Sequence, residues 1–448
     1  MEKNRFILDI KRLGINGEGI GFYNKLAIFV KNAIPGEGID VEITKTMPKM
    51  ALGKIVEFKK TSPYRVKPEC PYYERCGACQ VMHIDYQKMA EFKRDLVIEA
   101  IKRYTKLNPS SFEIKPTLLA LEQYHYRNKA TLIIRRDMGK NAVAMIEEGS
   151  NRHFAIKDCL VQDEKINDIN AKIIDLSNKL DVKSFGCQDF SWRYLVTRVT
   201  KNTRESLVCL VVYKYDDEIK QFAETIVKEG IADSVYVNIN PDDKTHDIFG
   251  EKTIFVGGKK SVLENINKYQ FNIYPTTFFQ LNTKQTEVLY QEVKKAAKLS
   301  HKERVLDAFC GVGTIACYIA NLSKEVIGIE YNKEAINAAK ENQALNKIKN
   351  VKFYQGNIAK LLPELIAKDL TFDVAIFDPP RTGLGKDVIN TIMDINIKRI
   401  VYVSCNPSTL AKDLAILSNK YKVRYIQPVD MFPQTSHVET VTLLDLKN

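Results

Sequence analysis

Cys405 stands at the end of a short apolar run, immediately before Asn406 and Pro407. The run from Arg399 to Val403 is rich in β-branched residues and stops at an Asn-Pro pair, which predicts a buried strand that ends in a turn. In open α/β sheets, ligands bind outside the carboxyl ends of the strands, so a cysteine at such an end can meet a ligand. A lone cysteine is more often a buried structural residue. The neighbouring motifs favour a nucleophile instead.

A second group of residues suits a nucleoside ligand. Gly311 and Gly313 follow the predicted strand Arg304–Phe309, and Glu330 closes the next strand 17 residues after Gly313. Glycines let the backbone approach a ligand closely, and a carboxylate at the second strand end can accept both ribose hydroxyls. Position 316 is Ala, so the full dinucleotide fingerprint is missing. The shortened motif suits S-adenosylmethionine, which has no pyrophosphate, better than NAD.

Three cysteines lie within ten residues, at Cys70, Cys76 and Cys79, in a loop-like stretch without apolar periodicity. This spacing is typical of a metal or cluster site rather than of packing. Zinc requires a fourth ligand nearby, which His83 could supply. An iron–sulfur cluster also takes four thiolates, and Cys159 is the candidate for a distant fourth ligand. The five-residue first gap argues against radical S-adenosylmethionine chemistry.

Two stretches ahead of the nucleoside motifs carry their own signals. Four strand-like runs with Gly-rich breaks fill the first 60 residues and predict a small β-barrel; they are residues 6–10, 27–30, 38–43 and 53–58. The Gly14–Gly19 break has no helix after it, which excludes a dinucleotide-binding turn. Apolar residues from Tyr86 to Tyr104 recur at helical spacing. The segment Tyr124–Arg136 mixes aromatic and basic residues, a pattern that suits RNA but also a solvated surface.

Composition sets the outer limits. The 448 residues carry a net charge of +12, which predicts two or three domains and favours a polyanionic partner. Nine cysteines, an odd number, argue against a disulfide framework. No apolar run is long enough to cross a membrane and the N-terminus lacks a signal-peptide core, so we expect a cytoplasmic protein that binds no membrane.

Five motifs occur in one order along the chain, and together they resemble the RNA (uracil-5-)methyltransferase family. They are F-F-Q-L-N at 278–282, D-A-F-C-G-V-G at 307–313, D-P-P-R-T-G at 378–383, S-C-N-P at 404–407 and F-P-Q-T-S-H-V-E at 432–439. The N-terminal stretch resembles a TRAM domain. With Cys70, Cys76, Cys79 and Cys159, it resembles the subgroup that methylates 23S ribosomal RNA and holds a 4Fe–4S cluster.

The resemblance implies a mechanism and a set of roles. Carbon 5 of uracil is a weak nucleophile, and attack of a thiolate on carbon 6 activates it. By resemblance Cys405 is this nucleophile and Glu439 is the base that removes the proton from carbon 5. The cofactor S-adenosylmethionine would contact residues carried over from the family: Gln280, Phe309, Gly311, Gly313, Glu330, Asn357 and Asp378. The target base has to flip out of folded RNA to reach the thiol.

The expected fold is α/β. A TRAM-like barrel over residues 1–60 precedes an α+β central domain with the cluster over 61–270, and a Rossmann-like methyltransferase domain covers 271–448. We expect a monomer that binds RNA, 23S ribosomal RNA first, and no DNA. Three alternatives stay open: a transfer-RNA uracil-5-methyltransferase, an exocyclic amino methyltransferase and a non-catalytic iron–sulfur RNA-binding protein. The pair Cys405 and Glu439 argues against the last two.

Overall fold

A computed structural model describes residues 4–184, 191–242 and 247–447 of the chain. It divides into two compact units. Unit 1 contains residues 1–121 and 377–448, and unit 2 contains residues 122–376. The predicted boundary at residue 60 coincides with the end of a strand, whereas the one predicted after residue 270 falls inside a strand. No helix in the described ranges is long and apolar enough to cross a membrane.

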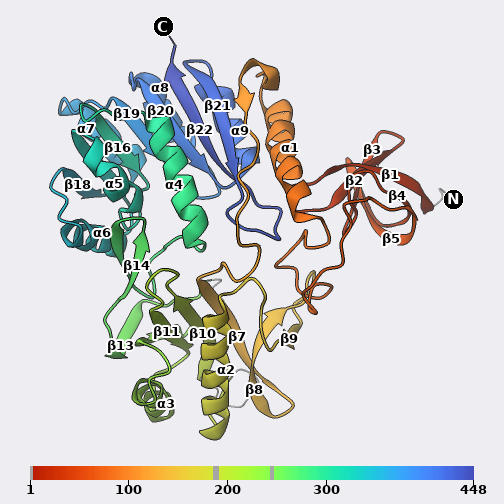
Figure 1. Cartoon of the computed structure of the whole chain (residues 1–448), viewed down its shortest axis with the longest axis vertical. Helices are drawn as coiled ribbons and strands as arrows, with labels where there is room; N and C mark the ends of the chain where they lie inside the picture. The colour runs from red at the N-terminus through yellow and green to blue at the C-terminus, as the bar shows by residue number, and fades with distance from the viewer. Residues whose placement is uncertain (1–3, 185–190, 243–246, 448) are drawn as a thin grey trace. The chain divides into compact units, whose positions relative to one another are not determined.

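The start of unit 1 is a closed five-stranded barrel, drawn in red (Figure 1), as the sequence predicted. Its strands run in the order β1-β2-β3-β5-β4, with bounds β1 Arg5–Leu13, β2 Gly19–Tyr23, β3 Leu26–Val30, β4 Gly38–Met47 and β5 Met50–Lys60. The sequence missed β2 because its glycines look like a loop. Gly21 is required there, since a Cβ would lie 2.6 Å from the Asp9 carbonyl oxygen.

The rest of unit 1 joins a helix near the N-terminus to the last third of the chain. Helix α1 begins at Tyr86, where the Asp85 side chain caps it, and ends at Tyr104, as predicted. Four strands follow the order β20-β22-β21-β6. The bounds are η1 Pro109–Ser111, β6 Glu113–Ile114, α8 Lys386–Asp394, β20 Arg399–Ser404, α9 Pro407–Leu417, β21 Tyr421–Val429 and β22 Glu439–Leu446.

The barrel shares a hydrophobic core with helix α1. Leu13 and Ile34 of the barrel segment pack with Val81, Met89 and Leu96, and Ile34 is fully buried. Because these residues come from both elements, burying them stabilises the barrel and the helix together. The barrel is therefore packed into unit 1 rather than attached by a linker.

Unit 2 begins with a seven-stranded sheet in the order β13-β12-β11-β10-β7-β8-β9. Its central strands β10 and β11 are almost completely buried and carry long apolar runs, as expected for strands covered on both faces. Bounds are β7 Lys129–Asp137, β8 Lys140–Ile146, β9 His153–Ala155, α2 Glu164–Lys179, β10 Trp192–Val199, β11 Ser206–Val212, α3 Asp217–Lys228, β12 Ser234–Ile239, β13 Lys252–Gly258, and the hairpin β14 Val262–Ile266 and β15 Tyr269–Ile273.

The second half of unit 2 alternates strands and helices as the sequence predicted. Strands β18, β17 and β16 pair in parallel, and β19 follows β16 in the sheet. The bounds are α4 Thr283–Ala297, β16 Arg304–Ala308, α5 Thr314–Ile319, η2 Ala320–Leu322, β17 Glu325–Glu330, α6 Lys333–Leu345, β18 Val351–Gln355, α7 Ile358–Ala367 and β19 Val374–Phe377. Parallel strands with helical crossovers are the architecture that places ligands at strand ends.

Candidate active site

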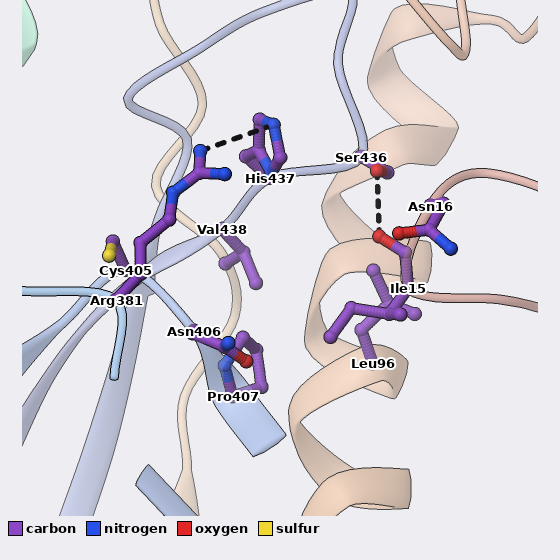
Figure 2. A pocket seen from close by; sticks show the side chains of 10 residues that line it. All are labelled: Ile15, Asn16, Leu96, Arg381, Cys405, Asn406, Pro407, Ser436, His437 and Val438. Carbon is purple, nitrogen blue, oxygen red and sulfur yellow. Dashed lines mark hydrogen bonds between the residues drawn. The ribbon is translucent and has the colours of Figure 1, made fainter. Parts of the chain in front are cut away.

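A pocket of about 110 Å³ in unit 1 opens beside the sulfur of Cys405 (Figure 2). Cys405 follows the last residue of β20, and Asn406 caps helix α9 with its side chain accepting a hydrogen bond from the Ser408 N–H at 3.0 Å. The predicted strand end and turn are therefore correct. They hold the thiol at the wall of a cavity, partly exposed, where a substrate can reach it.

The electrostatics around Cys405 oppose a resting thiolate. Burial and the nearby charges of Glu439 and Asp378 raise the pKa of Cys405 to about 11, and Arg381 opposes this shift. The protonated thiol therefore dominates at neutral pH. A nucleophile of this kind needs a proton acceptor at the moment of attack.

Two carboxyl groups near the thiol have pKa values in the range where they can exchange protons at neutral pH. Glu439, the first residue of β22, is buried, and burial raises its pKa to about 8 with a further contribution from Asp378. Burial also raises the pKa of Asp378 to about 7. A carboxyl group whose pKa lies near the working pH is suited to general acid–base catalysis. Unit 1 thus brings the predicted nucleophile, the predicted base and Asp378 together.

Arg381 is the cation of this cluster. It follows Asp378-Pro379-Pro380, and it lowers the pKa values of both Cys405 and Glu439. Its Nη2 donates to Nε2 of His437 at 3.4 Å (Figure 2). Both side chains line the pocket. The sequence motifs contain Arg381 and His437, but their types alone did not assign them a role.

The barrel supplies part of the pocket wall, which the sequence analysis missed. Ile15 and Asn16, from the loop between β1 and β2, line the same cavity as Cys405. Ser436 Oγ donates to the Ile15 carbonyl oxygen at 2.8 Å, and Glu18 accepts from the Asn16 side chain at 3.0 Å. These contacts join residues more than 400 positions apart in sequence, so no local pattern could have indicated them.

A buried ion pair holds the loop that leads into Glu439. Lys93 of α1 is fully buried, and its Nζ lies 2.5 Å from Asp430 Oδ1 and 3.3 Å from the Phe432 carbonyl oxygen. The Tyr86 hydroxyl donates to Asp430 Oδ2 at 2.9 Å. Removing one member of such a pair leaves the other charge buried and uncompensated. Helix α1 therefore positions the segment that carries His437 and Glu439.

Unit 2 contains the predicted Gly-rich turn between β16 and α5. Phe309, Gly311 and Gly313 all have positive φ, at 65°, 53° and 78°. A Cβ at Gly313 would lie 2.7 Å from Phe353, so this position requires glycine for space as well as for conformation. The turn is tightly folded and keeps its backbone accessible in the way that the sequence predicted.

Glu330 lies at the end of β17 beside this turn. One oxygen of its carboxylate accepts the Gly311 N–H at 3.2 Å and the other accepts the Asn332 N–H at 2.9 Å. A carboxylate has about four acceptor sites, so further acceptor capacity remains for hydroxyl groups. Asn357 is exposed and caps α7, accepting the Ala359 N–H at 2.9 Å. The fold thus places Phe309, Gly311, Gly313 and Glu330 close together, and Asn357 at the end of the next strand.

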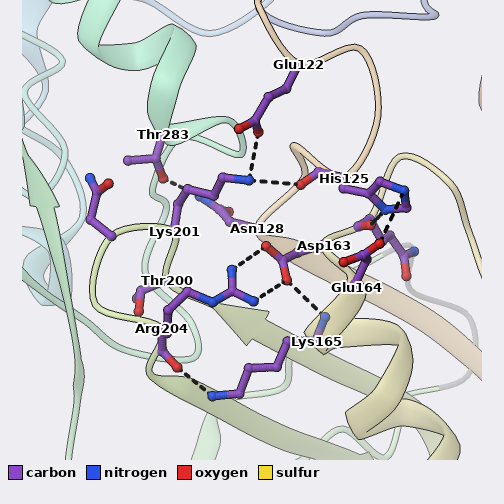
Figure 3. A network of polar contacts seen from close by, with 12 residues as sticks. Glu122, His125, Asn128, Asp163, Glu164, Lys165, Thr200, Lys201, Arg204 and Thr283 are labelled. Carbon is purple, nitrogen blue, oxygen red and sulfur yellow. Dashed lines mark hydrogen bonds and ion pairs between the residues drawn. The ribbon is translucent and has the colours of Figure 1, made fainter.

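The segment that carries Gln280 is held by Asn128. The Asn128 side-chain amide donates to the Gln280 carbonyl oxygen at 3.0 Å and to Thr283 Oγ1 at 3.1 Å. Figure 3 shows Asn128 and Thr283 within a polar network that also contains Lys201, which forms an ion pair with Glu122 at 2.7 Å.

The aromatic and basic segment Tyr124–Arg136 is partly structural. Tyr126 and Asn128 are buried, so neither is available to stack on a base. Burial also lowers the pKa of Lys129 to about 8. The RNA-binding interpretation of this segment therefore does not extend to these residues.

The predicted cluster cysteines fall in both units. Cys70, Cys76 and Cys79 lie on the turn-rich segment before α1, partly exposed, and Cys159 belongs to unit 2. Backbone N–H groups of Val161 and Gln162 donate to the Cys159 thiol, an arrangement that favours a thiolate.

Within the described ranges, no group of three or more His, Cys, Asp or Glu side chains is arranged to hold a metal ion. His83, the alternative zinc ligand, is buried, with Nδ1 2.6 Å from the Tyr73 hydroxyl oxygen. The structure therefore gives no support to a metal site, and the cluster stays a prediction from the sequence.

Two family models match the chain. The model described as tRNA (Uracil-5-)-methyltransferase matches residues 86–447, and the TRAM domain model matches residues 6–56. The TRAM match coincides with the closed barrel, and the larger match contains the nucleophile pocket, the Gly-rich turn and Glu330. The predicted family resemblance is thereby confirmed.

Relatives and a solved structure agree with the family models. A protein named as an uncharacterized RNA methyltransferase from Listeria monocytogenes is 40% identical, covering 100% of this chain and 98% of its own length. A protein of the same description from Bacillus anthracis is 40% identical over 99% of this chain and 97% of its own.

The crystal structure of Pyrococcus abyssi tRNA (uracil-54, C5)-methyltransferase in complex with S-adenosyl-L-homocysteine covers 99% of this chain and 100% of its own, with 26% identity and a TM-score of 0.76. The chain therefore belongs to the tRNA (uracil-5-)methyltransferase family, carries an N-terminal TRAM domain and is a methyltransferase.

Proposed function

We propose that this enzyme transfers a methyl group from S-adenosylmethionine to carbon 5 of uridine in RNA, through a covalent bond between Cys405 and carbon 6. The observation that carries the proposal is the cluster in unit 1: a partly exposed thiol whose pKa is raised by the charge of a buried carboxylate, Glu439. An exocyclic amino methyltransferase needs neither a thiol nor a second carboxylate base.

The steps follow from the residues present. The Cys405 thiol loses its proton as sulfur bonds to carbon 6, and the electrons of the carbon 5–carbon 6 double bond form an enolate. Carbon 5 then takes the methyl group from the sulfonium, which leaves as S-adenosylhomocysteine. Glu439 removes the remaining proton from carbon 5, the double bond re-forms and the Cys405 thiolate leaves. Electrons and protons balance without any redox partner.

Unit 2 would bind the methyl donor. Glu330, with acceptor capacity beyond its two backbone contacts, suits the ribose hydroxyls. The backbone of the turn from Phe309 to Gly313 would face the donor, and Gln280 and Asn357 would contact the donor or the uracil edge. The solved Pyrococcus abyssi relative, determined with S-adenosyl-L-homocysteine, supports this assignment.

Trapping with 5-fluorouridine tests the chemistry. Fluorine cannot leave as a proton, so the covalent complex should accumulate when the enzyme meets S-adenosylmethionine and RNA that contains 5-fluorouridine. We expect a slower band on denaturing electrophoresis for the wild type and no such band for Cys405→Ala. Ser404→Ala is the matched control, because it changes the neighbouring side chain and leaves the thiol. Absence of an adduct with both ribosomal and transfer RNA would refute the proposed reaction.

The target within RNA has two candidates. The TRAM-like barrel and the four cysteines resemble the 23S ribosomal RNA subgroup, which is the proposed target. Transfer RNA is the second candidate, because the solved transfer-RNA enzyme covers 99% of this chain, so the barrel region alone does not separate the two. Methylation of unmodified 23S ribosomal RNA and of unmodified transfer RNA, measured side by side, decides between them.

We also propose, from the sequence, that Cys70, Cys76, Cys79 and Cys159 bind a 4Fe–4S cluster. Such a cluster would be structural, because methyl transfer from a sulfonium needs no electron. Protein purified without oxygen should contain about four iron atoms per chain, and Cys76→Ser should lose the iron together with stability or RNA affinity. Cys209→Ser, at a buried position in β11, is the control. Iron-free wild-type protein would contradict this assignment, and a folded, RNA-binding but inactive Cys76→Ser would contradict the structural role.

A further inference from the structure

A second cavity in unit 1, of about 380 Å³, lies between the barrel and helix α1. We call it the barrel–helix groove, and its lining residues are Arg12, Ala27, Phe29, Lys49, Met50, Glu99, Lys102 and Arg103. Ligand pockets commonly have volumes of roughly 300–1,000 Å³, so the groove has room for a nucleotide-sized group. The nucleophile pocket does not include any of these residues.

The groove is strongly basic. Four of its lining residues are cations and one, Glu99, is an anion. Arg12 pairs with Glu99 at 2.8 Å and Lys102 pairs with it at 3.0 Å, so one carboxylate is shared by two cations. Among the described residues, neither Lys49 nor Arg103 has an acidic side chain within ion-pair distance. The groove therefore presents excess positive charge to a ligand, which favours a polyanion.

Apolar and aromatic residues form another part of the lining. Phe29 and Ala27 lie on the outward face of β3, half-buried, next to Met50 of β5. Phe22, an exposed neighbour on β2, has the Arg12 guanidinium 5.8 Å from its ring centre. Cations that contact phosphates beside rings on which bases stack are the usual composition of a site for single-stranded nucleic acid.

One stripe of helix α1 connects the groove to the nucleophile pocket. Leu96 lines the pocket, while Glu99 and Arg103 line the groove. Residues three and seven positions apart lie on the same face of a helix. Seven residues correspond to about 10 Å along the axis, a distance that a few nucleotides of an extended strand cover. The barrel contributes to both cavities as well, through Asn16 at the pocket and Arg12 at the groove.

We propose that the barrel–helix groove binds the single-stranded RNA that flanks the target uridine, with phosphates on Lys49, Arg103 and Lys102 and a base against Phe29. This inference rests on the proposed function, in which the uridine enters the Cys405 pocket. It assigns a defined face of the barrel to a defined part of the substrate. The groove then holds a strand a few nucleotides from the base while the pocket holds the base itself.

Binding of a fluorescein-labelled oligouridine of twelve nucleotides, measured over a range of salt concentrations, tests the proposal. The double variant Lys49→Gln/Arg103→Gln should bind about tenfold more weakly, and the slope of log Kd against log salt should fall by about two, because each lost phosphate contact removes about one. Phe29→Leu should weaken binding with an unchanged slope, because it removes stacking and no charge. Lys340→Gln/Lys368→Gln, at exposed positions on unit 2, is the charge-matched control and should resemble the wild type.

Thermal unfolding of all variants verifies that they are folded. Wild-type affinity and slope in Lys49→Gln/Arg103→Gln would overturn the proposal, and so would failure of the wild type to bind oligouridine. An equal loss of affinity for a twelve-residue polyglutamate would mark a general anion surface and would also overturn it. The adduct assay with 5-fluorouridine RNA is independent of this result. A wild type that binds through the groove but forms no adduct would refute the proposed chemistry and leave the groove standing.

Discussion

At the scale of single residues, the chemistry depends on how burial distributes protons among three groups. The pKa values of Cys405, Glu439 and Asp378 are raised to about 11, 8 and 7, and the causes are burial and mutual repulsion of negative charge. The site therefore starts from a neutral thiol and partly protonated carboxyl groups. Arg381 lowers the pKa values of Cys405 and Glu439, which favours the charged forms that the reaction passes through.

The raised pKa of Glu439 leads to a prediction about stability. Its pKa is raised from 4.5 to about 8, so the folded protein binds more protons than the unfolded chain between these values. Stability must then fall as pH rises through this window, by up to about 1.4 kcal/mol per pH unit from this group. Glu439→Gln cannot ionise, so its free energy of unfolding relative to the wild type should increase from pH 5 to pH 8. Urea unfolding at several pH values measures this, and a constant difference would contradict the raised pKa.

The catalytic role of Glu439 adds a second readout on the same variant. Turnover of the wild type should rise with pH toward about 8, because the base must be ionised. Glu439→Gln should form the bond to carbon 6 and transfer the methyl group, but it cannot remove the proton from carbon 5. A covalent RNA–protein complex should then accumulate with ordinary RNA. Turnover comparable to the wild type would contradict the role of base.

At the scale of elements, the Gly-rich turn between β16 and α5 depends on the packing of a neighbouring strand. Gly311 and Gly313 both have positive φ, yet only a Cβ at Gly313 would meet another group, the ring of Phe353 in β18. A Cβ at Gly311 would meet nothing within 4 Å. The two glycines therefore serve different purposes, although their letters in the sequence are the same.

These two glycines provide a matched pair of variants. Gly311→Ala should cost about 1 kcal/mol, from backbone conformation alone. Gly313→Ala should cost about 1–3 kcal/mol more, because Phe353 has to move. Thermal unfolding measures both, and Phe353→Leu added to Gly313→Ala should recover part of the difference. Equal costs for the two alanines would show that Phe353 does not constrain the turn.

At the scale of the whole molecule, the TRAM domain is part of the catalytic architecture of unit 1. It shares a core with α1 through Leu13 and Ile34, and it lines the nucleophile pocket through Ile15 and Asn16. A module that only increased RNA affinity would need neither contact. The arrangement implies that the barrel also shapes the site where the base reacts.

Removal of the barrel should therefore damage both stability and chemistry. A chain that starts at residue 61 would expose Val81 and Met89 and lose one wall of the Cys405 pocket. We expect a lower melting temperature and loss of adduct formation even at saturating RNA concentrations. Ile7→Ser, at an exposed position on the barrel, is the control for a change that leaves the shared core intact. Full adduct formation by the truncated chain would contradict the structural role of the barrel.

Short-range patterns in the sequence determined much of this protein. Helical spacing predicted α1 at its observed bounds, and β-branched runs predicted β17, β18 and β20. The ordered motifs predicted the family, which the matching models confirmed. Local patterns succeed here because helix periodicity, strand alternation and turn residues act over a few positions. The strand β2 was missed because its close packing against β1 requires glycine, which locally looks like a loop.

Tertiary structure alone decided what surrounds the reactive groups. Burial raises the pKa of Glu439, yet by its letter in the sequence this residue could equally be a surface glutamate. The contact of Ile15 with Ser436, the buried pair of Lys93 and Asp430, and the barrel–helix groove each join segments distant in sequence. Burial and charge coupling depend on which atoms meet in space, and that depends on the packing of the whole chain rather than on any one segment of it.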